Sequence, residues 1–302
     1  MSSNDNEKFI SLINKKKNDN VSHNNVVTHH KVDTAVSNVS ADGTKYALLI
    51  GINYLSDPYN KLNGCINDVK NVKEMLINKF NYKLENMVIL TDDQDATHMP
   101  TKQNILNSIS KIVASLRKND VLYIHYSGHG GNVKSTDSDE DNNPDTPGQD
   151  DCLYPCDFND NGIIIDDDLK ANLVNKIPQG AKLRCIFDCC HSGSALDLEY
   201  LWKQDNEFYK VSDDEKQSND CILISGCKDN QTSSDSWNQE RKEAGGALTM
   251  MLVKALTNTP TIKTSWKDLI LVVRHYLADN YYKQIPMLSV GDKALADENV
   301  SL

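Results

Sequence analysis

Long apolar runs are missing from this 302-residue chain. No uncharged apolar stretch approaches the roughly 18 residues that a membrane-spanning helix needs. The only early apolar segment, Phe9 to Ile13, is too short for the apolar part of a secretory signal. Internal repeats and heptads are also lacking. We therefore expect no membrane span and an intracellular location, in the cytoplasm with the nucleus left open.

Basic charge is also in deficit, with 32 Lys and Arg residues against 43 Asp and Glu residues and a net charge of -11. Phosphate contacts need basic patches, so this balance excludes a general nucleic-acid binder and fits a bound cation or a basic substrate better. The eight cysteines do not indicate a disulfide scaffold, which would be smaller and secreted. We expect reduced thiols.

Apolar runs of strand length alternate with amphipathic stretches of helix length along most of the chain. This alternation predicts an α/β fold, with a mostly parallel central sheet and helices on both faces. Residues 1–43 are rich in Asn, Lys, Ser and Val without a sustained period, which predicts a mobile arm. The expected strands are 45–52, 86–90, 121–126, 183–187, 221–225 and 286–290, and the expected helices are 63–79, 101–116, 166–176, 244–256 and 265–280. A short hairpin is expected from 152–155 and 162–165, and residues 196–219 look simply polar.

Two short strings follow buried strands and carry groups suited to catalysis. They are Y-S-G-H-G at Tyr126 to Gly130 and D-C-C-H-S-G at Asp188 to Gly193. In an open parallel sheet, chemistry occurs at the carboxyl ends of the strands. A histidine leaving one strand and a cysteine leaving another can meet there as base and nucleophile. The pattern indicates a cysteine peptidase.

Several histidines and cysteines compete for these two roles. His129 lies between two glycines and is free to reach a cleft, whereas His125 lies inside a strand and reads as a hydrogen-bonded core residue. Cys189 and Cys190 are adjacent, so their side chains diverge, and the string D-x-C-H-S-G selects Cys190. Cys185 lies in mid-strand and reads as a buried apolar residue. A zinc site is the rival interpretation. However, the strand and turn spacing does not bring its four ligands to one tetrahedral site; these are Cys185, Cys189, Cys190 and His191.

The two strings, in this order and about 60 residues apart, resemble the metacaspases, distant relatives of the caspases. The flanking strings Y-A-L-L-I-G-I-N-Y, L-N-G-C-I-N-D-V, D-D-C-L-Y-P, L-I-S-G-C-K-D-N-Q-T-S and G-G-A-L-T fit as well. The short interval between Cys190 and Cys221 resembles type I, although the proline- and glutamine-rich pro-region of many type I members is missing. The resemblance implies a caspase-like α/β/α sandwich over 44–302, with a large-subunit-like part at 44–196, a polar linker at 197–219 and a small-subunit-like part at 220–302.

The resemblance also implies roles for individual residues. His129 would be the base and Cys190 the nucleophile, and the backbone N–H groups of Cys190 and Gly130 would hold the oxyanion. Metacaspases cut after Arg or Lys because their specificity pocket is acidic. The matching positions here are Cys65, Asp68, Ser127 and Asp188. Without the family pattern, Asp68 could equally lie on the solvent face of its helix.

Calcium activation is the further implication of a type I resemblance, because carboxylate oxygens suit this hard cation. The matching ligands are Asp150, Asp166, Asp167 and Asp197. The remaining carboxylates of the loop 135–151 read as a solvated lid. A competing signal, the EF-hand-like string from Asp157 to Asp168, follows residues that read as a strand rather than an entering helix, so a hairpin turn is favoured.

The leading hypothesis is a calcium-dependent cysteine endopeptidase that acts as a monomer on proteins or peptides with Arg or Lys at the cleaved position. Self-cleavage is expected in the lysine-bearing arm or in the polar loop that holds Arg241 and Lys242. One alternative is a legumain- or paracaspase-like peptidase of the same clan, with different pocket chemistry or no calcium need. The other is a calcium-responsive, non-catalytic scaffold with a caspase-like fold.

Overall fold

We describe the fold from a computed structural model, in which contacts divide the chain into two units, Met1–Ala41 and Asp42–Leu302. The expected arm, most of the acidic loop, His191, Arg241 and Lys242 lie outside the described residues. The structure describes 43–135, 148–190, 193–203, 205–212, 220–226, 236–238, 243–258 and 263–302.

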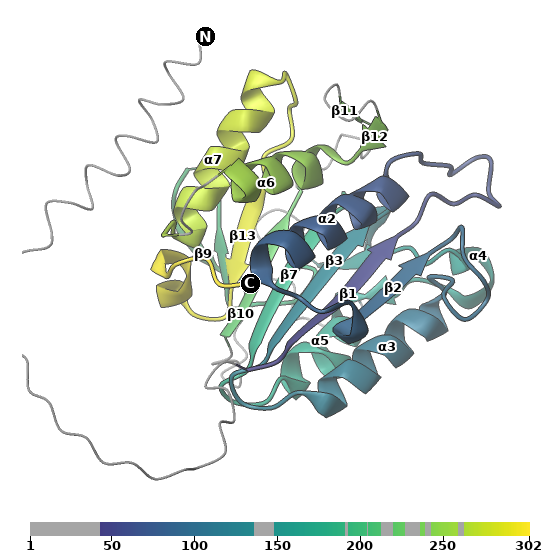
Figure 1. The fold of residues 1–302 in the computed structure, drawn as a ribbon, viewed down its shortest axis with the longest axis horizontal. Coiled ribbons are helices and arrows are strands. Elements are labelled where there is room, and N and C mark those ends of the chain that lie inside the picture. Colours follow the sequence, from purple (N-terminus) through teal and green to yellow (C-terminus); the bar gives the residue numbers. More distant parts are fainter. Residues whose placement is uncertain are drawn as a thin grey trace, which may run out of the picture. The chain divides into compact units, whose positions relative to one another are not determined.

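The central sheet of the second unit has eight strands in the order β2-β1-β3-β7-β10-β13-β8-β9 (Figure 1). The first five pair in parallel, whereas β13, β8 and β9 are joined to them by antiparallel pairs. This confirms the predicted mostly parallel sheet. The strands are β1 (Lys45–Gly51), β2 (Met87–Thr91), β3 (Val121–Ser127), β7 (Lys182–Asp188), β8 (Tyr200–Trp202), β9 (Phe208–Lys210), β10 (Asp220–Ser225) and β13 (Met287–Val290).

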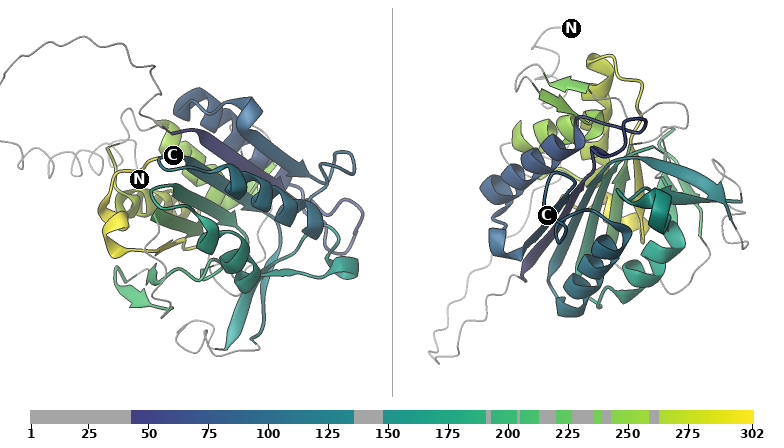
Figure 2. Two further views of the ribbon diagram at one scale, coloured as in Figure 1. Left: turned by 90° about the horizontal axis from the view of Figure 1, so that it is seen from below. Right: turned by 90° about the vertical axis from the view of Figure 1, so that its right-hand side faces the viewer.

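Helices cover both faces of this sheet, as the edge-on view in Figure 2 shows. One face carries α2 (Cys65–Phe80), α6 (Ala247–Asn258) and α7 (Trp266–Asp279), and the other carries α3 (Lys102–Ser115) and α5 (Asp166–Asn172). Single-turn 3-10 helices occur at Leu84–Asn86, Val174–Lys176 and Lys293–Asp297. None of the helices in the described ranges is long and apolar enough to cross a membrane.

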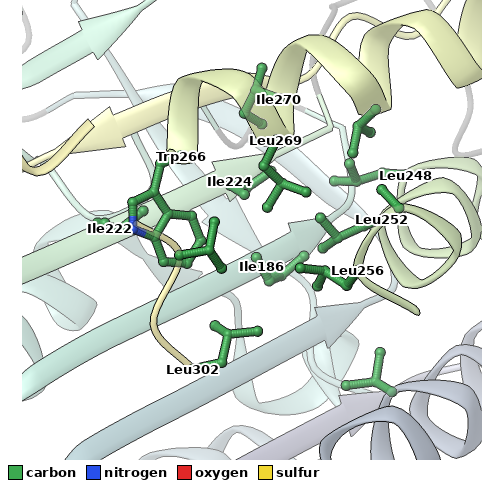
Figure 3. Packing of buried hydrophobic residues seen from close by; sticks show 14 of the residues in the cluster. Ile186, Ile222, Ile224, Leu248, Leu252, Leu256, Trp266, Leu269, Ile270 and Leu302 are labelled. Carbon is green, nitrogen blue, oxygen red and sulfur yellow. The ribbon is translucent and has the colours of Figure 1, made fainter. Parts of the chain in front are cut away.

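The sheet separates two apolar cores because consecutive side chains of a strand point to opposite faces. In β1, Ala47 and Leu49 pack with α2, α6 and α7, whereas Leu48 and Ile50 pack with α3 and α5. Figure 3 shows the first core, in which Ile186 and Ile222 of the sheet meet side chains of α6 and α7. Burial on both faces explains why the strands read as continuous apolar runs.

Side-chain caps fix the first residues of two helices. Thr101 caps α3, since its side chain accepts a hydrogen bond from the Asn104 N–H at 3.1 Å. Ser265 caps α7 in the same way, accepting from the Asp268 N–H at 3.1 Å. Each cap satisfies a backbone donor that the first helical turn leaves without a partner in the helix.

Two small sheets project from the main one. The predicted hairpin is confirmed, because β5 (Gln149–Leu153) and β6 (Ile164–Ile165) are antiparallel. The strand β5 precedes the turn that contains the short helix α4 (Phe158–Asn161), so the EF-hand-like string lacks an entering helix. The third strand of this sheet, β4 (Gly130–Lys134), was not predicted. Another pair is formed by β11 (Ser236–Asn238) and β12 (Glu243–Gly245).

Truncating a side chain in the first core tests the two-faced packing. Leu49 is fully buried in β1, so Leu49→Ala should lower the free energy of unfolding by about 2–5 kcal/mol. Leu84→Ala is the matched control, because Leu84 is 62% exposed and should change the stability by less than about 0.5 kcal/mol. Urea unfolding measures both, and equal effects would contradict the described core.

Candidate active site

The segments that carry His129 and Cys190 leave the sheet side by side. Strands β3 and β7 pair in parallel, with Ser127 opposite Asp188 at their carboxyl ends. His129 and Cys190 each lie two residues beyond that pair. The two segments lie so close together here that a side chain on Gly130 would collide with the carbonyl oxygen of Cys190. The register therefore brings the two predicted catalytic segments into contact at one edge of the sheet.

The imidazole of His129 is held by a backbone carbonyl. Its Nε2 lies 2.7 Å from the oxygen of Asn60, in the connection between β1 and α2. A carbonyl oxygen only accepts hydrogen bonds, so Nε2 carries the proton and Nδ1 is left as the basic nitrogen. His129 is half-buried. This arrangement gives the ring one defined tautomer for acid–base work.

The cysteines differ in their surroundings. Cys189 is fully buried in the second core, whereas its neighbour Cys190 is partly exposed. Cys185 is buried in mid-strand, as expected, and burial raises the pKa of its thiol well above the usual value. Burial also raises the pKa of Cys156 and of Cys221, each to about 12. Because the thiolate is the reactive form, these three thiols are poor nucleophiles.

His125 is a core residue, as the sequence predicts. It is fully buried, and burial lowers the pKa of its imidazole to about 3, so the ring is neutral. Its Nε2 lies 3.0 Å from the hydroxyl oxygen of Thr249 in α6. His125 therefore supports the start of α6 rather than reaching the edge of the sheet.

Asp68 is completely buried, which rules out the alternative that it faces solvent from α2. Its carboxylate accepts a hydrogen bond from the hydroxyl of Ser127 at 2.7 Å. The N–H of Gly246 lies 2.9 Å from both of its oxygens. Three distant parts of the sequence thus meet at one carboxylate.

Asp188 is the second buried carboxylate of this cluster. It accepts a hydrogen bond from the Thr249 N–H at 2.8 Å. Burial raises the pKa of the Asp188 carboxyl above its usual value, although the hydrogen bond from Thr249 acts in the opposite direction. A methyl group on Gly246 would collide with Asp188 and would lie 2.9 Å from Asp68. One glycine at the start of α6 therefore touches both acids.

The structure brings Asp68, Ser127 and Asp188 together, as the resemblance implies. Cys65 is buried one helical turn before Asp68, and its N–H donates to the side-chain oxygen of Asn53 at 2.9 Å. Gly246 and Thr249 complete the cluster and were not predicted as site residues. Their signal was the string G-G-A-L-T, which was noted without a role.

The four aspartates expected to bind calcium lie on three linked segments. Asp150 in β5, Asp166 at the start of α5 and Asp197 after β7 are buried, and Asp167 is partly buried. The Asp151 N–H donates to Asp166 at 2.5 Å, and the Asp151 carboxylate accepts from the Ser194 N–H and hydroxyl, each at 2.9 Å. The backbone carbonyl oxygen of Ser194 in turn accepts a hydrogen bond from the Asp197 N–H. In the part of the chain that the structure describes, no group of three or more His, Cys, Asp or Glu side chains is arranged to hold a metal ion.

Comparisons with known proteins place this geometry in a family context. Residues 45–199 match the family model described as metacaspase, peptidase C14 domain. Metacaspase-1 of Scheffersomyces stipitis is 37% identical over 298 residues, covering 83% of this chain and 71% of that protein. Metacaspase-1 of Meyerozyma guilliermondii is also 37% identical, covering 83% and 70%. Metacaspase-1A of Aspergillus oryzae is 38% identical, covering 82% and 68%.

Solved structures show the same fold. A Geobacter sulfurreducens protein superposes with a TM-score of 0.58 at 24% identity, covering 85% of this chain and 97% of that one. Caspase-1 of Spodoptera frugiperda superposes with a TM-score of 0.53 at 13% identity, covering 88% and 94%. The arrangement of sheet and helices is therefore caspase-like, and the predicted α/β/α sandwich is confirmed.

The close approach of Gly246 to both carboxylates yields a stability test. Gly246→Ala should lower the free energy of unfolding by about 1–3 kcal/mol, because the new methyl group must displace a buried carboxylate or the start of α6. Gly193→Ala is the control, since its methyl group would meet only the flexible end of the Met287 side chain. Urea unfolding of both variants measures the difference, and equal stabilities would contradict the close contact.

Proposed function

The chain belongs to the metacaspase family and is a cysteine peptidase, and on this basis we propose that it cleaves peptide bonds after Arg or Lys in a calcium-dependent manner. The observation that carries the specificity is the pair of buried carboxylates, Asp68 and Asp188, that share contact with Gly246. This pair lies at the start of α6, against the strands that lead to His129 and Cys190. The interval between Cys190 and Cys221 supports the type I organisation.

In this proposal Cys190 is the nucleophile and His129 the general base. Nδ1 of His129 accepts the thiol proton, and the sulfur attacks the carbonyl carbon of the scissile bond. The N–H groups of Gly130 and Cys190 stabilise the resulting oxyanion. When the C–N bond breaks, His129 returns the proton to the leaving amine and a thioester remains. Water, deprotonated by His129, then cleaves the thioester, releases the acid product and restores the thiol.

The buried acids supply the proposed specificity. A carboxylate that is removed from water is costly unless an opposite charge compensates for it. The guanidinium of Arg or the ammonium of Lys supplies that charge, and a planar guanidinium can bind two carboxylate oxygens at once. Ser127 orients the Asp68 carboxylate through its hydroxyl, and Cys65 packs one turn before it. Protein or peptide substrates with a basic side chain before the cleaved bond follow from this chemistry.

Calcium is proposed to bind the carboxylates of Asp150, Asp166, Asp167 and Asp197, which must draw closer to one another than they lie in this structure. Their all-oxygen chemistry suits this cation, and three of them are buried. When bound, calcium supplies positive charge that offsets the repulsion among these acids. Asp151 links their segments to the loop after Cys190 through Ser194. Asp151 and Ser194 would be the route by which the cation favours activity at Cys190.

We further propose that the enzyme acts as a monomer inside the cell and processes itself. None of the seven cysteines in the described ranges is in a disulfide, which supports a reducing environment. Self-cleavage would use a basic residue of the arm or of the loop with Arg241 and Lys242. A Cys190→Ala protein that is still processed without added protease would exclude self-cleavage in cis.

Peptide hydrolysis tests the catalytic and specificity assignments together. Fluorogenic peptides ending in Arg or Lys should be cleaved, and those ending in Asp should not.

Cys190→Ala should lower kcat by at least about 10³-fold. Asp188→Asn should lower kcat/KM for Arg peptides by about 30-fold or more, because a buried charge partner is lost. Asp297→Asn, at a side chain that is 69% exposed, should have no effect. Cleavage of Asp peptides, or full activity of Asp188→Asn, would refute the specificity.

Calcium removal tests the regulatory proposal. Chelator should abolish most of the activity, and added calcium should restore it. Calorimetry on Cys190→Ala should show calcium binding that Asp166→Asn weakens at least about tenfold, since a bound cation loses one anionic ligand, while Asp297→Asn binds normally. Unchanged turnover in chelator together with no calorimetric signal would contradict calcium dependence.

A further inference from the structure

Tyr54 adopts a backbone conformation that a bulky residue rarely takes. It lies in the connection between β1 and α2 with φ of 52°, in the left-handed region. Non-glycine residues are uncommon there, and a bulky residue is held there only when its surroundings enforce it. The side chain is nevertheless almost fully buried. This combination indicates that the contacts of the buried Tyr54 side chain outweigh the energetic cost of the strained backbone.

One carboxylate enforces this conformation. Asp92, just beyond the end of β2, accepts the N–H of Asn53 on one oxygen and the N–H of Leu55 on the other, each at 2.8 Å. The two N–H groups lie on either side of Tyr54 in the sequence. The side chain of Asn53 in turn accepts the Cys65 N–H at 2.9 Å, at the first residue of α2. The turn is thus fixed between the end of one strand and the start of a helix.

The side chain that this turn presents contacts His129 in two ways. The Tyr54 hydroxyl accepts the backbone N–H of His129 at 2.9 Å and donates to the carbonyl oxygen of Tyr154 at 2.7 Å. The Tyr54 ring also lies against the imidazole, with 4.6 Å between the ring centroids and an interplanar angle of 35°. Burial raises the pKa of the Tyr54 phenol well above its usual value, so the hydroxyl keeps its proton.

A second tyrosine holds the other end of the same residue. The Tyr126 hydroxyl donates to the carbonyl oxygen of His129 at 2.8 Å. Nε2 of the ring lies against the Asn60 oxygen. Neighbouring groups therefore contact the backbone of His129, one face of its ring and one of its ring nitrogens. Tyr54 and Asn60 belong to one connection, which the Leu62 N–H closes by donating to the Asn53 carbonyl at 2.9 Å.

We propose that Tyr54 is a positioning residue that aims the imidazole of His129 at Cys190. This inference rests on the proposed function. The hydroxyl fixes where the His129 backbone lies, and the ring limits rotation of the imidazole so that Nδ1 stays directed toward the nucleophile. Correct aim matters because a misplacement of about 1 Å can cost about 100-fold in rate.

The test separates the hydroxyl from the ring. Tyr54→Phe keeps the ring and loses the hydroxyl that accepts from His129 and donates to Tyr154, so kcat for an Arg peptide should fall about 3- to 10-fold with KM unchanged. Tyr54→Leu loses both and should lower kcat by about 100-fold, again with KM unchanged. Tyr123→Phe is the matched control. Tyr123 is fully buried in β3, its hydroxyl has no hydrogen-bond partner among the described residues, and its loss should leave kcat unchanged.

A spectroscopic readout distinguishes aim from general weakening of the fold. In the Cys190→Ala background, the ring-proton NMR signal of His129 should carry an upfield ring-current shift that Tyr54→Phe retains and Tyr54→Leu loses. If Tyr54→Leu does not fold, Tyr54→Phe and this shift still decide the matter.

Wild-type kcat in Tyr54→Phe, an effect equal to that of Tyr123→Phe, or a change in KM alone would overturn the positioning role. Failure of the proposed function looks different, because the wild-type protein would then not cleave the Arg peptide, or the Cys190→Ala protein would retain its turnover.

Discussion

The parallel pairing of β3 with β7 is the interaction on which the rest of the site depends. Its register sets Ser127 opposite Asp188, so that His129 and Cys190 leave the sheet at the same level. A slip of one residue would turn every side chain of a strand to the opposite face. The buried apolar residues on both faces of these strands prevent such a slip. The packing that stabilises the core therefore also fixes the geometry of the site.

The acidic cluster requires a second constraint, because two buried carboxylates repel each other and lose their hydration. Hydrogen bonds from Ser127, Gly246 and Thr249 offset part of that cost. In the proposed function, a basic substrate side chain meets the remaining electrostatic demand. Under that proposal, selectivity for Arg or Lys and the cost of burying two carboxylates have the same cause.

Much of this could be predicted from sequence. The strands β1, β3 and β7 were found within one or two residues, since continuous apolar runs mark strands that are buried on both faces. By contrast, β8 and β9 have only three residues each, and they extend the sheet by pairing β8 with β13 and β9 with β8. Such short strands leave no clear sequence pattern, so this stretch looked simply polar. The contacts of Gly246 and Tyr54 were beyond reach for another reason. Each depends on segments that meet only after folding, and no local pattern encodes such a meeting.

In the proposed function, one thiol beside an acidic cluster reacts with substrates that carry a basic side chain. Peptide mapping by mass spectrometry after treatment with an arginyl chloromethyl ketone measures this directly. We expect a single adduct on the Cys190 sulfur, formed far faster than with the aspartyl analogue. An adduct on Cys156, the other described cysteine that is not fully buried, or equal labelling by both reagents would contradict it.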